Sequence, residues 1–138
     1  TLLRECVRRL SDVGTRISLM DERGEIAAVQ NRAPQFDVGA NTDVMTGGQK
    51  AACCMMLLRA MRPDVLAFDE ISAPEDIEAI RIAAGCGVAL LATAHAQSVA
   101  ALRHRALYRA LLDEHIFRRA VCITRSDGER VYTVEDLT

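Results

Sequence analysis

Two acidic residues follow an apolar stretch that has the length of a β-strand, and this arrangement suits phosphate-transfer chemistry. The stretch V-L-A-F-D-E ends in Asp69 and Glu70. An aspartate at the end of such a strand can support Mg²⁺, and a glutamate beside it can orient and deprotonate an attacking water. The pattern therefore predicts a hydrolytic site with Asp69 on the metal ion and Glu70 as general base. The alternative is that both acids begin a solvated loop and cap the helix that follows.

A second strand-like stretch also ends in polar residues. Residues 88–95 read V-A-L-L-A-T-A-H, and Thr93 and His95 alternate with Ala94, so their side chains lie on the same face. In open α/β sheets, ligands bind at the carboxyl ends of the strands. We therefore expect Thr93 and His95 to hydrogen-bond a water or a γ-phosphate beside Asp69. The alternative is a structural histidine that a backbone carbonyl holds.

The glycine-rich loop that cradles phosphates does not occur in these residues, because no G-x-x-x-x-G-K-[ST] motif is present. Gly47-Gly48-Gln49-Lys50 places a lysine at the start of a helix, but it lacks the first glycine and the threonine. The chain opens with T-L-L-R-E, which often follows Gly-Lys-Thr in the helix after such a loop. We therefore expect the chain to begin just past a phosphate-binding loop. The alternative is an ordinary N-terminal helix, which has no capping residue ahead of it.

The elements that must position these residues alternate between helix and strand. We expect residues 31–48 to form a long loop, a kind that is usually functional or mobile. The apolar strands predict an α/β fold with a largely parallel sheet that helices cover on both faces. The predicted helices are residues 2–13, 49–61 (largely buried), 72–84 (opened by a Ser72/Glu75 capping box) and 98–114 (capped by Ser98, with a possible break near His104). The predicted strands are residues 16–21, 25–29, 64–71 and 88–95, and residues 120–125 and 131–134 form a hairpin.

Composition restricts the class of protein. A chain of 138 residues with 50% hydrophobic residues suits one domain with a real core. No apolar run approaches the ~20 residues of a membrane-spanning helix, and no secretory signal is visible. The five cysteines contain no C-x-x-C pair and show no zinc-ligand spacing to the histidines, which indicates free thiols in a reducing compartment.

The charge pattern bears on nucleic-acid binding. The net charge of -2 argues against a protein that coats nucleic acid. Five arginines lie between Arg103 and Arg119, and they leave open a nucleic-acid-dependent motor. Only Tyr108 and Phe117 interleave with them, which argues against base stacking. The alternative is a solvated helix face whose arginine stems cover apolar surface.

Five segments, taken together and in this order, resemble the stage III sporulation protein AA family. That family belongs to the RecA-like P-loop ATPases and is related to the type II and type IV secretion ATPases. The resemblance covers nearly the whole chain, and the order of the segments is specific although each one alone is weak. The segments are D-E-R-G-E-I-A (21–27), Q-F-D-V-G-A-N-T-D-V (35–44), M-M-L-L-R-A-M-R-P (55–63), D-E-I (69–71) and A-T-A-H (92–95).

The resemblance implies an ATPase that binds ATP and Mg²⁺ and forms a homo-oligomeric, hexameric ring. It implies a cytoplasmic protein on the mother-cell side, peripheral to the membrane-channel proteins of the sporulation apparatus, with no membrane insertion of its own. The charge and the sparse aromatic residues disfavour a nucleic-acid partner. Residues 1–138 would be the C-terminal portion of a single RecA-like core that starts just after the P-loop.

The resemblance also implies roles for particular residues. Asp69 would support Mg²⁺ and Glu70 would be the general base, while Thr93 and His95 would sense the γ-phosphate. Two further acids, Asp21 and Glu22, end a strand at the same sheet edge and would complete the cofactor site. Thr1 would be the P-loop threonine or the residue after it.

Two positions depart from the family pattern. Asn41 stands where the family usually has Arg before T-D-V. If that family arginine reaches the nucleotide of a neighbouring subunit, this chain needs another arginine for the task. Arg32 is the nearest substitute. Ala96 follows A-T-A-H, where the family commonly has Gly.

Lack of the P-loop strand has a structural consequence. In the RecA-like order this strand lies between residues 88–95 and 120–125, so without it two apolar strand edges are left unpaired. Two alternatives to a sporulation-type secretion ATPase remain open at this point. One is the nucleic-acid-dependent motor, and the other is a catalytically inactive scaffold subunit.

Overall fold

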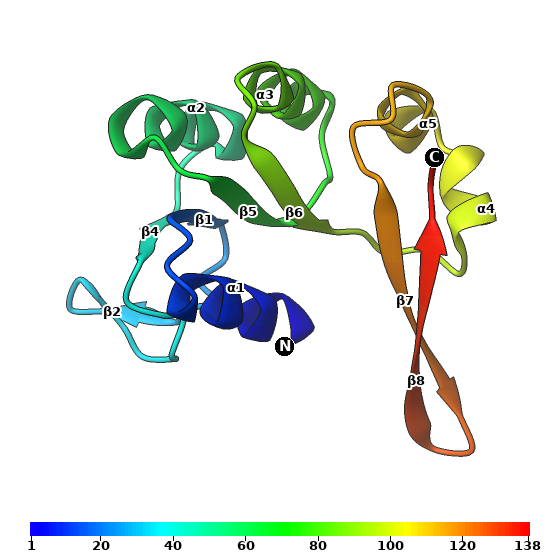
Figure 1. Ribbon diagram of the computed structural model, residues 1–138, viewed down its shortest axis with the longest axis horizontal. Coiled ribbons are helices and arrows are strands. Elements are labelled where there is room, and N and C mark those ends of the chain that lie inside the picture. Colours follow the sequence, from blue (N-terminus) through cyan, green and yellow to red (C-terminus); the bar gives the residue numbers. More distant parts are fainter. The chain divides into compact units, whose positions relative to one another are not determined.

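The structure, a computed structural model, describes residues 1–138, which divide into two compact units, Thr1–Ala94 and His95–Thr138. Each unit is described by itself below, and Figure 1 labels their elements. The first unit contains α1 (Leu2–Asp12), β1 (Ile17–Asp21), β2 (Val29–Gln30), β3 (Ala33–Pro34), β4 (Thr42–Thr46), α2 (Lys50–Met61), β5 (Val65–Glu70), α3 (Pro74–Gly85) and β6 (Ala89–Thr93). The second contains α4 (Val99–Arg103), α5 (Ala106–Asp113), β7 (Arg119–Ser126) and β8 (Glu129–Asp136).

A four-stranded parallel sheet forms the centre of the first unit. Its strand order is β4-β1-β5-β6, and every neighbouring pair runs parallel. Helix α2 carries the chain from β4 to β5 and α3 carries it from β5 to β6, as parallel neighbours require. The predicted α/β fold with a mostly parallel sheet, flanking helices and a C-terminal hairpin is confirmed.

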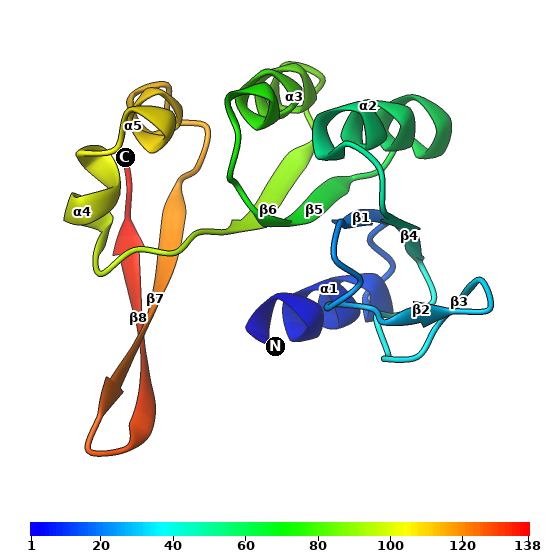
Figure 2. The same cartoon turned by 180° about the vertical axis from the view of Figure 1, so that it is seen from behind.

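Helices cover both faces of this sheet, with α1 on one face and α2 and α3 on the other, as both views show (Figures 1 and 2). Successive side chains of a strand point to opposite faces, so β5 contributes to two cores. Val65 and Ala67 join the cluster that contains Leu3 and Val7 of α1. Leu66 and Phe68 pack instead beside side chains of α2 and α3, among them Cys54, Ala79 and Ile80.

The region between β1 and α2 differs from its predicted form. The predicted loop over 31–48 is wrong in part, because Ala33–Pro34 and Thr42–Thr46 are strands. Strand β4 is an edge strand of mixed polarity, T-D-V-M-T, and none of its residues is buried, so apolar periodicity does not reveal it. The predicted strand over 25–29 is also wrong, since only Val29–Gln30 is extended there and it pairs with β3.

The starts of α1 and α3 also differ from their predicted form. Helix α1 does have a cap, because the Thr1 hydroxyl accepts the backbone N–H of Arg4 at 3.3 Å. The predicted Ser72/Glu75 capping box is wrong. Helix α3 begins at Pro74, and it is the Asp76 carboxylate that accepts the backbone N–H groups of Ser72 and Ala73, at 2.9 and 3.0 Å.

The prediction of a largely buried helix over 49–61 holds only in part. Cys53, Cys54 and Leu57 of α2 are buried, but Met56 is 59% exposed and Met61 is 45% exposed. None of the helices has the length and apolar content that crossing a membrane requires.

The second unit consists of two short helices and a hairpin. The predicted helix over 98–114 is capped by Ser98, whose hydroxyl accepts the N–H of Ala101 at 3.1 Å, and it breaks at His104 as expected. Asp127 and Gly128 have φ of 51° and 83° and form the two-residue turn that right-twisted hairpins favour. A small core joins the helices to the hairpin and contains Val99, Leu112 and Leu137, with Ala120 and Cys122 packed against it.

One face of the hairpin, the apolar hairpin face, carries four exposed apolar side chains. Val121 pairs with Val134 and Ile123 pairs with Tyr132 across the two strands. These side chains are between 50% and 67% exposed. In the first unit, β6 is one of the two outer strands of the sheet, and β5 is its one neighbour. Unpaired edges and an apolar sheet face both favour association with another surface.

We expect the 138-residue chain to self-associate, with the apolar hairpin face as one contact. Val134→Lys should weaken association roughly tenfold, the equivalent of about 1.4 kcal/mol, because an ammonium must lose water in an apolar contact. Sedimentation velocity over a range of concentrations measures this. Val13→Lys is the matched control, since Val13 is an isolated apolar residue that is 79% exposed in the first unit. A chain that is monomeric at every concentration contradicts the expectation.

Candidate functional site

Charged side chains gather where β1 and β5 end, around the first residue of α2. The ammonium nitrogen of Lys50 lies 3.3 Å from Glu22 Oε2, 3.5 Å from Asp76 Oδ2 and 3.7 Å from Asp69 Oδ1. Glu22 follows β1, Asp69 belongs to β5, and Asp76 is in the first turn of α3. Three carboxylates from three elements therefore share one ammonium. We call Glu22, Lys50, Asp69 and Asp76 the carboxylate–lysine cluster.

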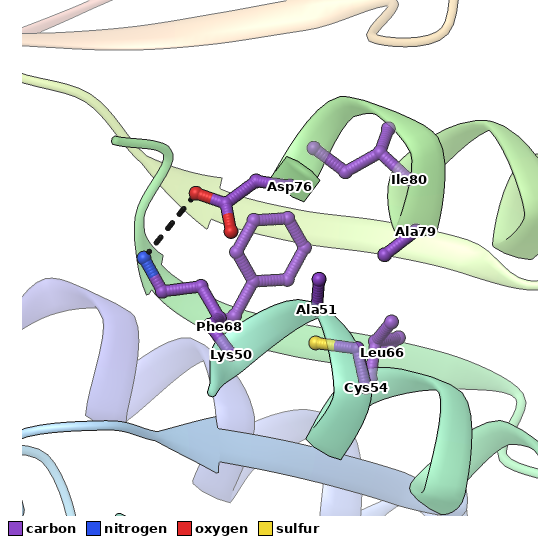
Figure 3. A pocket seen from close by; sticks show the side chains of 8 residues that line it. All are labelled: Lys50, Ala51, Cys54, Leu66, Phe68, Asp76, Ala79 and Ile80. Atoms are coloured by element: carbon purple, nitrogen blue, oxygen red, sulfur yellow. Dashed lines mark ion pairs between the residues drawn. The ribbon is translucent and has the colours of Figure 1, made fainter. Parts of the chain in front are cut away.

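The side chain of Lys50 is deeply buried, with 6% of its surface exposed. Figure 3 shows its ammonium group directed at Asp76, with the Phe68 ring and apolar side chains of α2 and α3 close by. The space among these side chains does not admit a water molecule. The ammonium also donates to the Glu70 carbonyl and, at 3.2 Å, to the Ser72 hydroxyl.

Lys50 stays charged in this environment. Burial alone lowers the pKa of its ammonium, but the negative charges of Asp76, Glu22 and Asp69 outweigh burial and raise the pKa above its ordinary value. A buried charge is tolerated only when it is paired and hydrogen-bonded, and here the carboxylates and the two further acceptors satisfy it. The cluster therefore holds a permanent positive charge at its centre.

Asp69 occupies an irregular position at the end of β5. Phe68 pairs with Ala92 and Glu70 pairs with Thr93, so Asp69 is the additional residue of a β-bulge. Bulges redirect side chains and are common next to active sites. Asp69 Oδ1 is shielded from solvent and has no hydrogen-bond partner. Burial raises the pKa of this carboxyl, Glu22 and Asp21 raise it further, and Lys50 and Arg23 oppose them.

The donor set suits a magnesium ion that also has phosphate and water ligands. Carboxylate oxygens are ligands that Mg²⁺ prefers, and it commonly takes only one or two of them from the protein. No group of three or more His, Cys, Asp or Glu side chains is arranged to hold a metal ion by itself. The unpartnered Oδ1 of Asp69, beside other negative charges, is the donor that fits such an ion.

The bulge places Glu70 opposite Thr93, at the same sheet edge as Asp69. The Thr93 carbonyl accepts the N–H of Ile71 at 3.2 Å, which ties the two strand ends together. The structure thus brings Glu22, Asp69, Glu70 and Thr93 to one edge of the sheet. Their catalytic and binding roles stay predictions.

His95 is the first residue of the second unit, so the site described here, which belongs to the first unit, does not include it. Its backbone carbonyl accepts a hydrogen bond from Arg105 at 2.8 Å within the second unit. Thr1 caps α1, and the hydrogen bonds and ion pairs of the carboxylate–lysine cluster do not involve it.

Asp21 has a different environment from the neighbouring Glu22. It is fully buried, and its carboxylate accepts the backbone N–H groups of Glu25, Ile26 and Ala27 at 2.8–3.1 Å. These bonds fold the chain back after β1. They account for Asp21 as a residue that shapes the loop, and its role in a cofactor site stays a prediction.

Asn41 lies at the start of β4, at the amino end of the parallel strands. Its backbone N–H donates to the Ser11 hydroxyl at 2.8 Å, and its side-chain amide donates to the Ser11 carbonyl at 3.1 Å. The residue therefore anchors the end of α1 to β4. It lies at the opposite sheet edge from the carboxylate–lysine cluster, because that cluster follows the carboxyl ends of β1 and β5.

Sequence reasoning missed the two residues that complete the cluster, Lys50 and Asp76. The sequence pattern indicates for Lys50 only an imperfect P-loop lysine, and it indicates no site role for Asp76. The available signal was that Lys50 is the only lysine of the chain and begins an apolar helix that must pack beside the Asp69 strand.

Comparisons with known proteins agree with this fold. A family model described as "Sporulation stage III, protein AA" matches residues 1–135. Stage III sporulation protein AA of Bacillus subtilis (strain 168) is 35% identical over 134 residues, which cover 93% of this chain and 43% of that protein. The solved VirB11 ATPase of the Brucella suis type IV secretion system, in complex with sulphate, superposes with a TM-score of 0.54 at 17% identity, over 97% of this chain and 50% of that chain. The chain thus spans about half or less of the length of these relatives.

We expect Asp21→Asn to destabilise the first unit by about 1–3 kcal/mol, because an amide group then faces buried backbone N–H groups that have lost an acceptor. The midpoint of urea unfolding measures this. Asp12→Asn, which changes an exposed aspartate of α1, is the matched control and should stay within about 0.5 kcal/mol of the unchanged chain. Equal midpoints for Asp21→Asn and the unchanged chain contradict the loop-holding role.

Asp69→Asn should have the opposite effect. A carboxyl whose pKa is higher in the folded chain than in the unfolded chain costs stability as pH rises through that interval. Removing its charge should therefore stabilise the fold at pH 7, and by less near pH 4. Thermal melting at the two pH values measures this.

Asp64→Asn is the matched control for that experiment. Its carboxylate is bonded to Arg16, which lowers the pKa to about 2, so this substitution should not stabilise the chain at pH 7. Loss of stability in Asp69→Asn at pH 7 contradicts the expectation.

Proposed function

Because the chain belongs to the stage III sporulation protein AA family, we propose that the whole protein is an ATPase that serves sporulation. The carboxyl-end cluster of this chain would be its hydrolytic site. The observation that carries the proposal is the β-bulge at Asp69, which sets an unpartnered buried carboxylate oxygen beside Glu70 at the ligand-binding edge of a parallel sheet. The VirB11-like fold and family membership support it.

In this proposal the residues of the chain have distinct tasks. Mg²⁺, when bound with ATP, supplies positive charge that stabilises the phosphate oxygens during transfer, and Asp69 would hold it. The Glu70 carboxylate would orient the attacking water and accept its proton. Lys50 fixes the Glu70 backbone through the Glu70 carbonyl, and this fixes the point from which the Glu70 side chain projects.

Three further residues, Thr93, His95 and Thr1, belong to the proposal. Thr93 lies opposite Glu70, and its hydroxyl would hydrogen-bond the water or the γ-phosphate. His95 would act as a second γ-phosphate sensor and Thr1 as part of the phosphate-binding region, both on the strength of the family resemblance. We propose that the phosphate-binding loop itself lies in the part of the whole protein outside this chain, because the chain covers 43% of its Bacillus subtilis relative.

We further propose that the whole protein forms a hexameric ring in the cytoplasm on the mother-cell side. The ring would act on membrane-channel proteins of the sporulation apparatus. Family membership supports this assembly, and the net charge of -2 disfavours a nucleic-acid partner. The rival function is a catalytically inactive scaffold subunit, and the following experiment distinguishes it from an ATPase.

We expect Glu70→Gln in the whole protein to bind ATP normally and to hydrolyse it roughly 10²- to 10⁴-fold more slowly, because the water loses its proton acceptor. Steady-state phosphate release measures turnover, and equilibrium binding of labelled ATP measures affinity. Glu75→Gln, an exposed glutamate in the first turn of α3, is the matched control and should leave both unchanged. Normal turnover in Glu70→Gln refutes the base assignment, and absence of hydrolysis in the unchanged protein favours the scaffold.

A further inference from the structure

We propose that Lys50 is the internal counter-ion of the proposed magnesium site. Its ammonium group occupies the space between Glu22 and Asp69, keeps these carboxylates in place, and holds the affinity for a divalent cation alone low. Metal binding then depends on the phosphates that arrive with it. This inference rests on the proposed function, because the cation concerned is the one that binds with ATP.

The position of the ammonium group is the first argument. Its nitrogen lies 3.3 Å from Glu22 Oε2 and 3.7 Å from Asp69 Oδ1, so one cation already lies beside two acids at the carboxyl ends of adjacent strands. The distance to Asp69 exceeds that of a hydrogen bond, and Oδ1 is left without a hydrogen-bond partner. The lysine therefore compensates the charge of Asp69 without using its lone pairs.

The balance of charge is the second argument. Glu22, Asp69 and Asp76 carry three negative charges within 4 Å of one ammonium, which leaves two uncompensated, the charge of one divalent cation. Arg23 adds a weaker attraction for Asp69, and Asp21 adds a weaker repulsion. The cluster can thus accept a divalent cation, although the ammonium repels it.

The fixed position of Lys50 is the third argument. A surface lysine would swing away from an incoming metal ion, but the side chain of Lys50 is 6% exposed and its stem passes the Phe68 ring (Figure 3). The Glu70 carbonyl and the Ser72 hydroxyl accept hydrogen bonds from the same ammonium. The positive charge therefore remains in the cluster when a cation binds, and its repulsion acts throughout.

The test measures binding of Mn²⁺, as a probe for Mg²⁺, to the whole protein without nucleotide. Electron paramagnetic resonance reports the free Mn²⁺ concentration directly. We expect Lys50→Met to bind Mn²⁺ at least about threefold more tightly, because a nearby positive charge is removed. Lys50→Gln, which keeps a donor for the Glu70 carbonyl, should do the same and serves if the Met variant does not fold. Lys50→Arg keeps the charge and should stay within about twofold of the unchanged protein.

Arg16→Met is the matched control. It also removes one positive charge from the first unit, but Arg16 pairs with Asp64 at the amino end of the strands. Mn²⁺ affinity should not change in this variant. Thermal melting confirms that each variant is folded before its affinity is compared.

Each outcome bears on the inference independently of ATP hydrolysis. Tighter Mn²⁺ binding in the neutral Lys50 variants, and not in Arg16→Met, supports the counter-ion role even if the unchanged protein hydrolyses no ATP. No gain in affinity in either folded neutral variant overturns it, even if the unchanged protein is an active ATPase. An equal gain in Arg16→Met also overturns it, because the effect then reflects net charge alone.

Discussion

The carboxyl-end edge of the sheet depends on one buried ammonium group. Lys50 begins α2, yet its nitrogen touches the residue after β1, the end of β5 and the start of α3. Without this charge, Glu22, Asp69 and Asp76 would repel one another, and the repulsion is costly because Asp69 and Asp76 are shielded from solvent. The ammonium fixes the ends of separate elements relative to one another. Precise placement of catalytic groups needs such support from residues beside them.

The same edge contains structure that stability alone does not favour. The bulge interrupts the pairing of β5 with β6, and Asp69 is left with a buried oxygen that has no hydrogen-bond partner. Asp21, at the end of the neighbouring strand β1, contrasts with Asp69, since backbone N–H groups bind its carboxylate. Local departures of this kind collect at functional sites, where the rest of the fold compensates for them.

Much of the fold follows from local sequence pattern, whereas the cluster does not. Strands β5 and β6 were predictable because their apolar runs have strand length, and the helix break at His104 was visible as well. Strand β4 was missed because an edge strand that is half exposed lacks the apolar signal. Asp69 and Glu70 were recognisable because they are adjacent at a strand end. Lys50 was not, because its partners come from three other segments, and only the folded sheet brings these ions together.

The charge of the cluster also explains why hydrolysis would need more than this chain. The polyphosphate of ATP is strongly negative, and Glu22, Asp69 and Asp76 outnumber the one ammonium among them. Lys50 cannot bind phosphate in addition, because its side chain is buried and its three N–H groups already face acceptors. Phosphate binding requires donors that this edge lacks, such as the backbone N–H groups of a glycine-rich loop. In the proposed function, Asp69 and Glu70 would serve cleavage, and binding of the phosphates would need further donors.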